Sequence, residues 1–436
     1  MTTRTDWTNW SRIQRCDPAQ TRHPTTEDEL VDTVAEATRA GRRVKVAGSG
    51  HSFTGIALTD GTHIHLDRYG QVLEADRETG RVRVQAGIRL RDLNEALAAH
   101  GLAMENLGDI AEQTISGATQ TGTHGTGARL GNLSTQIVGL RLVTAGGDVI
   151  DGSAEHNADI FHAARIGLGA LGAVSTVTLQ CVPAFNLHAL EQSERLDDLL
   201  GDLDGHADAN EHFEFHWFPH TPYCQTKRNN RTDDAVSTRG RWKEWRDSIL
   251  MENVLFGAVC RLGRRFPSRI PGLARFVGSQ VGKVWKVERS DRVFASTRLV
   301  HFNEMEYAIP REDAAGAIGA VRDLIDRSGI RTNIPVEVRF VAGDDIWLSP
   351  AHGRDTCYIA VHQFWGLPFT QYFLGVEEIM KARGGRPHWG KLHYQSAETL
   401  APRYPRWSDF QALRRRLDPE GTFTNEYLDR VLGPIP

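Results

Sequence analysis

A short segment in the second half of the chain places a carboxylate and a guanidinium two residues apart. In Pro335-Val-Glu-Val-Arg-Phe340, the alternation typical of a β-strand puts Glu337 and Arg339 on one face and apolar side chains on the other. A carboxylate can orient a hydroxyl or accept its proton, and a guanidinium can stabilise a developing negative charge. A surface ion pair explains the pattern equally well, so the segment alone leaves both interpretations open.

A second group of reactive side chains lies near the C-terminus, in Pro387-His-Trp-Gly-Lys-Leu-His393. His388 and Lys391 are three residues apart and cannot share a face of a regular strand, so a bend at Gly390 is needed to bring them together. The imidazole and the amine could then serve one site. A structural loop is the alternative.

Two segments of small residues in the first half could wrap around a ligand. Gly48-Ser-Gly-His-Ser-Phe53 follows a predicted strand, and residues 115–127 are rich in backbone amides and hydroxyls but carry few bulky side chains. Glycine allows close backbone approach, and amide N–H groups can be aimed at phosphate oxygens or at a ring system. A flexible loop is the alternative, but the composition favours a ligand cradle because each glycine adds to the entropy cost of folding.

Two further patterns do not lead to a site. Gly167-Leu-Gly-Ala-Leu-Gly172 has the spacing of a dinucleotide-binding loop, but a helix-like segment precedes it and a strand-like segment follows, the reverse of the order that a nicotinamide site needs. His212, Glu214 and His216 share one face of a predicted strand and could ligate a metal. Because no further ligand spacing supports zinc, we prefer a strand with a polar face and predict no metal site.

The surrounding segments predict mixed α and β structure in the first half of the chain. A capping-box pattern at Thr26 starts a helix that Gly41 ends. The other elements expected from periodicity are strands over 42–47 and 82–86 and a helix over 90–101. Beyond residue 184 the segments lengthen, so a second domain is expected to begin there, with the polar residues 228–241 as a loop.

Composition describes an ordinary globular protein. The 436 residues are 40% hydrophobic and 24% charged, with a formal net charge of −4, and no apolar run approaches the roughly 20 residues of a membrane-spanning helix. The two densest basic runs, Arg261–Arg269 and Arg414–Arg416, predict solvated helix faces and no nucleic-acid partner. Residues 1–8 contain no apolar signal core, which predicts a cytoplasmic protein. The cysteines lack paired spacing and are interpreted as reduced: Cys16, Cys181, Cys224, Cys260 and Cys357.

Five motifs together resemble those of the aldonolactone oxidoreductases, which include the L-gulono-1,4-lactone and D-arabinono-1,4-lactone oxidases. The alditol oxidases are close relatives, and all belong to the vanillyl-alcohol oxidase superfamily. The resemblance runs in order along nearly the whole chain. The motifs are Gly48-Ser-Gly-His-Ser-Phe53, Gly122-Thr-His-Gly-Thr-Gly127, Pro335-Val-Glu-Val-Arg-Phe340, Gly384-Gly-Arg-Pro-His-Trp-Gly-Lys391 and Leu417-Asp-Pro-Glu-Gly-Thr-Phe-Thr-Asn425.

The resemblance implies an α+β fold with three parts. Residues 1–184 would form an FAD-binding domain of two α/β subdomains with the flavin between them. Residues 185–384 would form a substrate domain, in which helices cover a large, mostly antiparallel sheet. Residues 385–436 would be a C-terminal tail that returns to the flavin.

The resemblance also implies which residues hold FAD. His51 matches the position at which family members bond the flavin 8α-methyl group through an imidazole nitrogen, and His388 matches a residue beside the isoalloxazine ring. The other implied cofactor contacts are Gly48, Ser49, Gly50, Ser52, Thr119, Gly122, Thr126, Gly127 and Val174.

The implied reaction is hydride transfer from a carbinol carbon of a sugar lactone to flavin N5, with loss of the hydroxyl proton to a base. Glu337 ranks first as that base and His388 second, while Arg339 and Lys391 are candidates for a fixed cation that stabilises the reduced flavin. Oxidation of L-gulono-1,4-lactone at C2 would give a keto-lactone that tautomerises to an ascorbate-type ene-diol.

Two other functions remain open at this point. Alditol oxidation, with xylitol or sorbitol as substrate, would use the same glutamate, arginine and lysine. A flavin-binding or metal-binding protein without turnover is disfavoured because Glu337, Arg339 and Lys391 are all present. The resemblance does not decide whether dioxygen or an electron carrier reoxidises the flavin.

Overall fold

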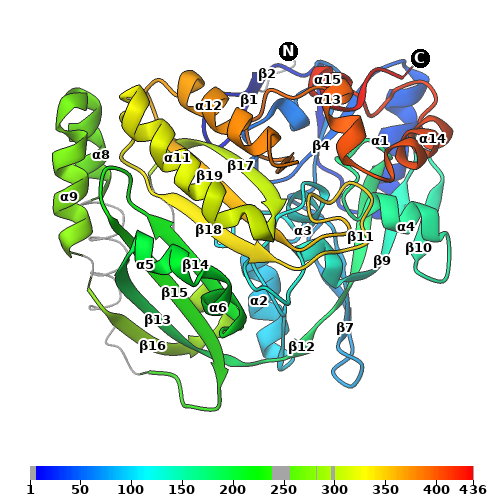
Figure 1. Cartoon of the computed structure of the whole chain (residues 1–436). Helices are drawn as coiled ribbons and strands as arrows, with labels where there is room; N and C mark the ends of the chain where they lie inside the picture. Colours follow the sequence, from blue (N-terminus) through cyan, green and yellow to red (C-terminus); the bar gives the residue numbers. More distant parts are fainter. Residues whose placement is uncertain (1–5, 238–255, 281, 296–299, 436) are drawn as a thin grey trace.

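The computed structural model describes residues 6–237, 256–280, 282–295 and 300–435 (Figure 1). Within these ranges the strands form an eight-stranded antiparallel sheet, a five-stranded antiparallel sheet, a three-stranded parallel sheet and two short pairs. Helices pack on the sheets. The predicted α+β fold with a large antiparallel sheet is therefore confirmed.

The first half contains the two smaller sheets. The parallel sheet has the order β3 (Gln20–Arg22), β5 (Thr62–His65), β4 (Val44–Ala47), and the antiparallel sheet has the order β10 (Val149–Ser153), β9 (Ile137–Val143), β11 (Ala173–Gln180), β7 (Arg81–Gln85), β6 (Val72–Ala75). The helices are α1 (Glu27–Arg39), α2 (Leu90–Ala99), α3 (Ile115–Gln120) and α4 (Ala158–Ala164). Two short strand pairs complete this half: β1 (Trp7–Thr8) with β2 (Arg15–Cys16), and β8 (Leu102–Ala103) with β12 (Val182–Pro183).

Local sequence signals account for these elements. The Thr26 side chain accepts a hydrogen bond from Glu29 N at the start of α1, and Gly41 has a φ of +62° just beyond the end of the helix, as the capping pattern predicts. Helix α4 precedes the glycines of residues 167–172 and β11 follows them. The predicted reversal of the dinucleotide-binding order is therefore confirmed.

The second half is built on the large sheet. Its order is β16 (Val284–Arg289), β13 (Asn186–Arg195), β15 (Tyr223–Thr232), β14 (His212–Trp217), β18 (Val336–Val341), β19 (Thr356–Phe364), β17 (Phe302–Pro310), β20 (Arg386–Pro387). The helices of this half are α5 (Leu196–Gly201), α6 (Leu203–Asp208), α8 (Phe256–Arg265), α9 (Ile270–Gln280), α10 (Ser290–Phe294), α11 (Ala314–Ser328) and α12 (Thr370–Lys381).

The loop predicted over residues 228–241 is wrong for its first part, because residues 228–232 belong to β15. Their polar side chains find partners across the surface of the sheet: Arg228 pairs with Glu194 and Arg231 with Glu211. Because these polar side chains are paired in the folded protein, a strand can carry them, although a run of polar residues in the sequence is typical of a loop. Residues 238–241 lie outside the described residues.

The two faces of the large sheet differ in chemistry. One face presents apolar side chains, among them Phe215, Val338 and Met305, to helices α5, α6, α11 and α12, which cover it (Figure 1). The opposite face carries charged side chains that are also buried, among them Glu337 and Arg339. Because successive residues of a strand point to opposite faces, the same strands serve the core and a polar interior. That polar face lies against the first half of the chain.

The C-terminal segment returns to the first half. Its helices α13 (Ala397–Leu400), α14 (Trp407–Leu417) and α15 (Glu426–Leu432) place side chains such as Phe410 and Leu428 in the same hydrophobic core as α1 and α2. The Asn425 side chain donates to three carbonyl oxygens just beyond the glycine-rich loop, those of Gly55, Ile56 and Leu58. The division at residues 184 and 384 stays a prediction.

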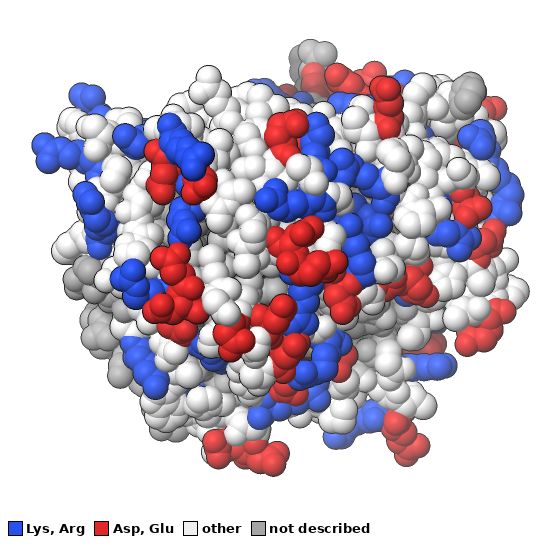
Figure 2. Space-filling model, in the orientation of Figure 1, with Lys and Arg blue, Asp and Glu red and all other residues white. Residues whose placement is uncertain are grey.

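The charged surface mixes both signs (Figure 2). The side chains of Arg415 and Arg416 are exposed, as the helix-face interpretation predicts, but Arg414 is buried, and its guanidinium donates to Gly433 O and the Thr424 hydroxyl. The prediction was therefore wrong for Arg414, whose partners come from the following helix and turn. The cysteines are free, as predicted. In the described part of the chain, no helix is long and apolar enough to cross a membrane.

Thr126 joins the two halves, and this gives a first prediction. Its hydroxyl donates to Phe213 O on β14 and accepts from Phe340 N on β18 at 3.2 Å. Thr126→Val leaves both groups buried without their partner, so we expect the free energy of unfolding to fall by about 1–3 kcal/mol in urea unfolding. The flavin content of the purified protein should not change. Loss of flavin at unchanged stability would instead make Thr126 the cofactor contact that the resemblance implies.

Candidate active site

Two adjoining cavities meet at His51. The first, which we call the glycine-lined cavity, has about 840 Å³ of empty volume, part of it open to solvent, and is bounded by the loop 48–52, α3 and the turn before β11. The second, the charged chamber, has about 750 Å³ and lies between the first half and the polar face of the large sheet. His51 and Ser52 line both cavities.

Close packing explains the glycines of the first cavity. A Cβ on Gly48 would lie 2.5 Å from Thr114 Oγ1, and one on Gly172, whose φ is +150°, would lie 2.5 Å from Val143 O. A larger residue at Gly172 would require backbone movement, and one at Gly48 would displace the Thr114 side chain that caps α3. The Ser49 hydroxyl is buried in this wall without a hydrogen-bond partner among the described residues, which is the state expected of a group that a ligand completes.

The structure brings together only some of the residues implied as cofactor contacts. Gly48, Ser49, Gly50, His51, Ser52 and Val174 line the glycine-lined cavity, and His388 lines the charged chamber. Thr119, Gly122, Thr126 and Gly127 line neither of these two cavities. The Thr119 hydroxyl bonds to Ile115 O within α3, and Gly127 N donates to Phe340 O on the large sheet. Thr119 thus stabilises its own helix and Gly127 joins the two halves, and the cofactor contacts implied for these four residues stay predictions.

The N-terminal segment holds the loop around His51, which the sequence did not indicate. Asn9 Nδ2 donates to Ser52 O at 2.9 Å and Trp10 N donates to Gly50 O at 2.8 Å, so the backbone on both sides of His51 is tied down. The Trp10 indole stacks on the His51 ring with 5.7 Å between centroids. Burial lowers the pKa of His51 to about 4, which leaves the imidazole neutral at physiological pH.

Strand β18 brings Glu337 and Arg339 into the charged chamber. Their exposed fractions are 8% and 5%, so the surface ion pair considered from the sequence is wrong. Arg339 Nε lies 2.5 Å from Glu337 Oε1 and 3.0 Å from Glu214 Oε2, and Nη2 lies 3.6 Å from Asp109 Oδ2. Burial alone would raise the pKa of Glu214, but Arg339 and Lys227 lower it overall. The pair is thus part of a buried ionic network.

His388 and Lys391 enter the same chamber from a turn, as the predicted bend at Gly390 requires. Lys391 N donates to His388 O at 3.0 Å and closes the turn. Phe53 N donates to Gly390 O at 2.7 Å, and His388 N donates to Glu306 O at 3.0 Å. The turn is therefore fixed between the His51 loop and strand β17.

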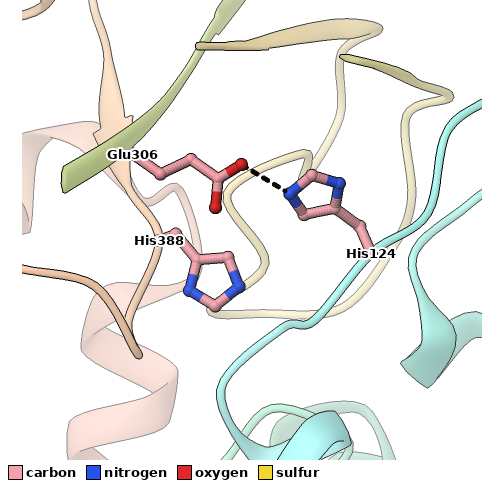
Figure 3. A group of neighbouring side chains, drawn as sticks. All are labelled: His124, Glu306 and His388. Carbon is pink, nitrogen blue, oxygen red and sulfur yellow. Dashed lines mark hydrogen bonds and ion pairs between the residues drawn. The ribbon is translucent and has the colours of Figure 1, made fainter. Parts of the chain in front are cut away.

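A buried triad of His124, Glu306 and His388 lies at the centre of the chamber, where the Glu306 carboxylate points toward the His124 ring and His388 lies beside both (Figure 3). His124 Nε2 is 3.1 Å from Glu306 Oε1, and Nδ1 is 2.8 Å from Gly125 O. Sequence reasoning singled out neither Glu306 nor His124, although His124 lies in the motif 122–127. Alternation along β17 could have indicated Glu306, but only the contact between the two halves brings these residues to His388.

The triad has ligand atoms within 4.8 Å of one another, a spacing that a metal ion could use. The hydrogen bonding of His388 argues against it. Gly390 N donates to His388 Nδ1 at 3.0 Å, so the proton of the neutral ring lies on Nε2. Neither nitrogen then offers a free lone pair to a metal. The ring instead presents an N–H donor, and burial lowers the pKa of His388 to about 3, which keeps it neutral.

The strand with a polar face predicted around His212, Glu214 and His216 is present as β14. These three side chains do not gather around one point: His212 Nδ1 contacts Thr126 O, Glu214 pairs with Arg339, and His216 Nε2 lies 3.4 Å from Glu337 Oε2. They form no metal-ligand group among the described residues. Glu214 and His216 instead surround the ion pair of β18.

Comparison with known proteins agrees with this geometry. The family model described as D-arabinono-1,4-lactone oxidase matches residues 177–431, more than half of the chain. The chain belongs to this family. A model described as an FAD-binding domain matches residues 18–153. Members of the family are FAD-linked oxidoreductases that act on CH–OH groups, and the flavoprotein and oxidoreductase assignments from the sequence are confirmed.

Similar proteins cover nearly the whole chain. An L-gulono-1,4-lactone dehydrogenase of Mycobacterium tuberculosis is 48% identical over 98% of this chain and 99% of its own. An L-gulonolactone oxidase of Scyliorhinus torazame is 38% identical over 97% of both chains, and an alditol oxidase of a Streptomyces species is 32% identical over 98% of both. A solved structure of a solvent-stable cholesterol oxidase has a TM-score of 0.84 at 17% identity over 99% of this chain and 98% of its own, which shows a shared fold.

The lowered pKa of His388 predicts how stability depends on pH. Below the ordinary pKa of about 6.5, the unfolded chain takes up a proton at this residue, whereas the folded protein does so only near pH 3. Folding stability is therefore lost as the pH falls through this window, by about 1.4 kcal/mol per pH unit for such a group. His388→Gln should make the free energy of unfolding, measured in urea between pH 6.5 and 4.5, less dependent on pH. Parallel curves for the two proteins would contradict this.

Proposed function

We propose that this protein uses FAD to oxidise L-gulono-1,4-lactone or a closely related aldonolactone to a keto-lactone of the ascorbate type, and that His51 bonds the flavin covalently. One observation carries the proposal: the buried Glu337–Arg339 pair and Lys391 line a chamber that adjoins His51 and the glycine-lined cavity. The 48% identical relative is named an L-gulono-1,4-lactone dehydrogenase, which supports this choice of substrate.

The residues of the glycine-lined cavity fit the cofactor. The loop 48–52 and Val174 would hold FAD, and the unpartnered Ser49 hydroxyl would complete its hydrogen bonding there. The bound flavin supplies a hydride acceptor. The His51 imidazole is neutral because its pKa is lowered to about 4, so a ring nitrogen keeps the lone pair that a bond to carbon needs. The stacked Trp10 ring fixes the plane of the imidazole.

The chamber residues have different roles in the proposed reaction. Glu337 accepts the proton of the substrate hydroxyl, and Arg339 and Lys391 supply fixed positive charge for the negative charge that develops. His388, ranked second as the base, has its Nδ1 lone pair engaged by Gly390 N and its proton on Nε2. It therefore orients a substrate or cofactor oxygen as a donor, and Glu337 is the stronger candidate for the base.

Replacement of the base gives a direct prediction. Glu337→Gln keeps the shape and the hydrogen bond to Arg339 but cannot accept a proton, so we expect kcat to fall by about 10²–10⁴-fold. Flavin absorbance and thermal unfolding of the same preparation show whether the cofactor and fold are retained. A kcat within threefold of the wild type would remove Glu337 from the role of base.

The covalent bond is tested by denaturing the purified yellow protein in acid. We expect the flavin to stay with the precipitate in the wild type and to be released from His51→Ala, because that variant lacks the imidazole nitrogen. Release from both proteins would overturn the covalent bond alone. A colourless protein that binds no added FAD would overturn the whole proposal.

The substrate class is tested by anaerobic bleaching of the flavin absorbance. L-Gulono-1,4-lactone should bleach the enzyme, and admission of air or of a cytochrome or quinone then identifies the electron acceptor by the return of colour. The 32% identical alditol oxidase makes polyols the second candidate class. Bleaching by xylitol and not by the lactone would show that the substrate is a polyol.

A further inference from the structure

Two buried carboxylates of strand β17 line the charged chamber. They belong to none of the sequence motifs and have no part in the proposed reaction. Glu304 and Glu306 are two residues apart, point to the same face and are 6% and 5% exposed. Each carboxylate contacts Nε2 of an imidazole: Glu306 pairs with His124, and Glu304 pairs with His362. Nδ1 of each ring contacts a backbone oxygen, that of Gly125 for His124 and that of Pro335, at 2.9 Å, for His362.

Glu304 contacts Lys391 through its side chain and the next residue, Leu392, through its backbone. Lys391 Nζ lies 2.5 Å from Glu304 Oε2, and Glu304 O accepts a hydrogen bond from Leu392 N at 2.9 Å. The ammonium also lies 5.3 Å from the centre of the Phe53 ring. The side chain of Glu304 is only 8% exposed, so the amine and its carboxylate are largely removed from water.

We propose that Glu304 is a positioning residue that keeps Lys391 charged and aimed into the substrate chamber. The inference rests on the proposed function only in giving Lys391 a part in the reaction. His362 extends the arrangement, because its contact with Pro335 O connects Glu304 to the residue that precedes β18, the strand of Glu337 and Arg339. The two groups of catalytic candidates are thus connected through Glu304, His362 and the backbone of Pro335.

Electrostatics explains why the lysine needs this partner. Burial on its own lowers the pKa of Lys391, since it disfavours the charged form, but Glu304 and then Glu306 raise it above its ordinary value. Other titratable groups that face the amine are Asp109, His51, His362 and His388. The carboxylate of Glu304 is the largest favourable contribution. Without it, the lysine would lose its proton at a lower pH.

Glu304→Gln tests the proposal because it keeps the size and an acceptor oxygen but removes the charge. The rate of flavin reduction by substrate at pH 7.5 should fall by about 10- to 100-fold, as expected for the loss of one fixed charge at a developing anion. Activity should recover as the pH is lowered, because Lys391 is protonated again. A merely structural defect would lower the rate equally at every pH, and that result would overturn the proposal.

Glu377→Gln is the matched control. Glu377 is also a buried carboxylate, 4% exposed, and it contacts β17 from the opposite face, where its Oε2 accepts from the Tyr307 hydroxyl at 2.5 Å. This variant should keep the wild-type pH profile even if it is less stable. Glu304→Asp, which restores the charge, should regain most of the pH profile of the wild type.

A second readout does not depend on turnover. The Lys391 side chain is 19% exposed and lines the chamber, so a small acylating reagent such as acetic anhydride can reach it. Only the neutral amine reacts, and peptide mass spectrometry at a series of pH values reports the midpoint of labelling. The midpoint should move to lower pH in Glu304→Gln and stay in place in Glu377→Gln. An unchanged midpoint would overturn the proposal whether or not the lactone proves to be the substrate.

A double substitution shows whether the effect passes through the lysine. If Glu304 acts through Lys391, adding Glu304→Gln to Lys391→Met should slow flavin reduction little further, because residues that act as a unit are not additive. A further loss as large as that of the single variant would assign Glu304 a separate role and contradict the proposal.

Discussion

The positive charge of Arg339, buried between two halves of the chain, is the constraint around which the chamber is built. A guanidinium removed from water is costly unless carboxylates surround it, and here they come from its own strand, from β14 and, through Asp109, from the first half. Each carboxylate in turn needs a cation or an imidazole. Around the chamber the interface between the halves is therefore an ionic network, which leaves a polar space for a hydroxyl-rich ligand. A hydrophobic cluster in which Phe53 packs with Phe302 and Phe364 also joins the halves.

Backbone hydrogen bonds determine what the side chains in this space can do. The amide of Gly390 fixes the tautomer of His388. The carbonyl oxygen of Gly125 contacts Nδ1 of His124, and that of Pro335 contacts Nδ1 of His362. Such a contact at one ring nitrogen fixes the orientation of the imidazole and the state of the other nitrogen. The chemistry of the chamber therefore depends on loops that contribute no reactive group of their own.

Short-range patterns were sufficient to predict much of this arrangement. Strict alternation placed Glu337 and Arg339 together on one face, and glycine spacing located the loop around His51. The same alternation could not show whether the polar face was exposed, because burial depends on Asp109 and His124, which come from segments some two hundred residues away.

Long-range partners also explain what the sequence did not show. Thr126 and Gly127 belong to a motif of small residues, and their hydrogen bonds go to the large sheet; their implied contact with the cofactor stays a prediction. Glu304 and Glu306 alternate with Met305 and Tyr307, as the charged residues of β18 alternate with apolar ones, but they were not singled out from the sequence. A carboxylate on an otherwise apolar strand becomes meaningful only once its neighbours are known.

The return of the C-terminal segment has a consequence for how the protein is made. The turn with His388 and Lys391 and the anchor at Asn425 lie in the last fifty residues, yet they close over the loop that begins at Gly48. During synthesis the first half can fold before these residues leave the ribosome. The glycine-lined cavity is lined by residues 7–174 and can then form, whereas the charged chamber still lacks the wall that His388 and Lys391 supply. The charged chamber is therefore completed only once residues 387–391 have been made, and a chain cut before them would keep the glycine-lined cavity but leave the chamber open.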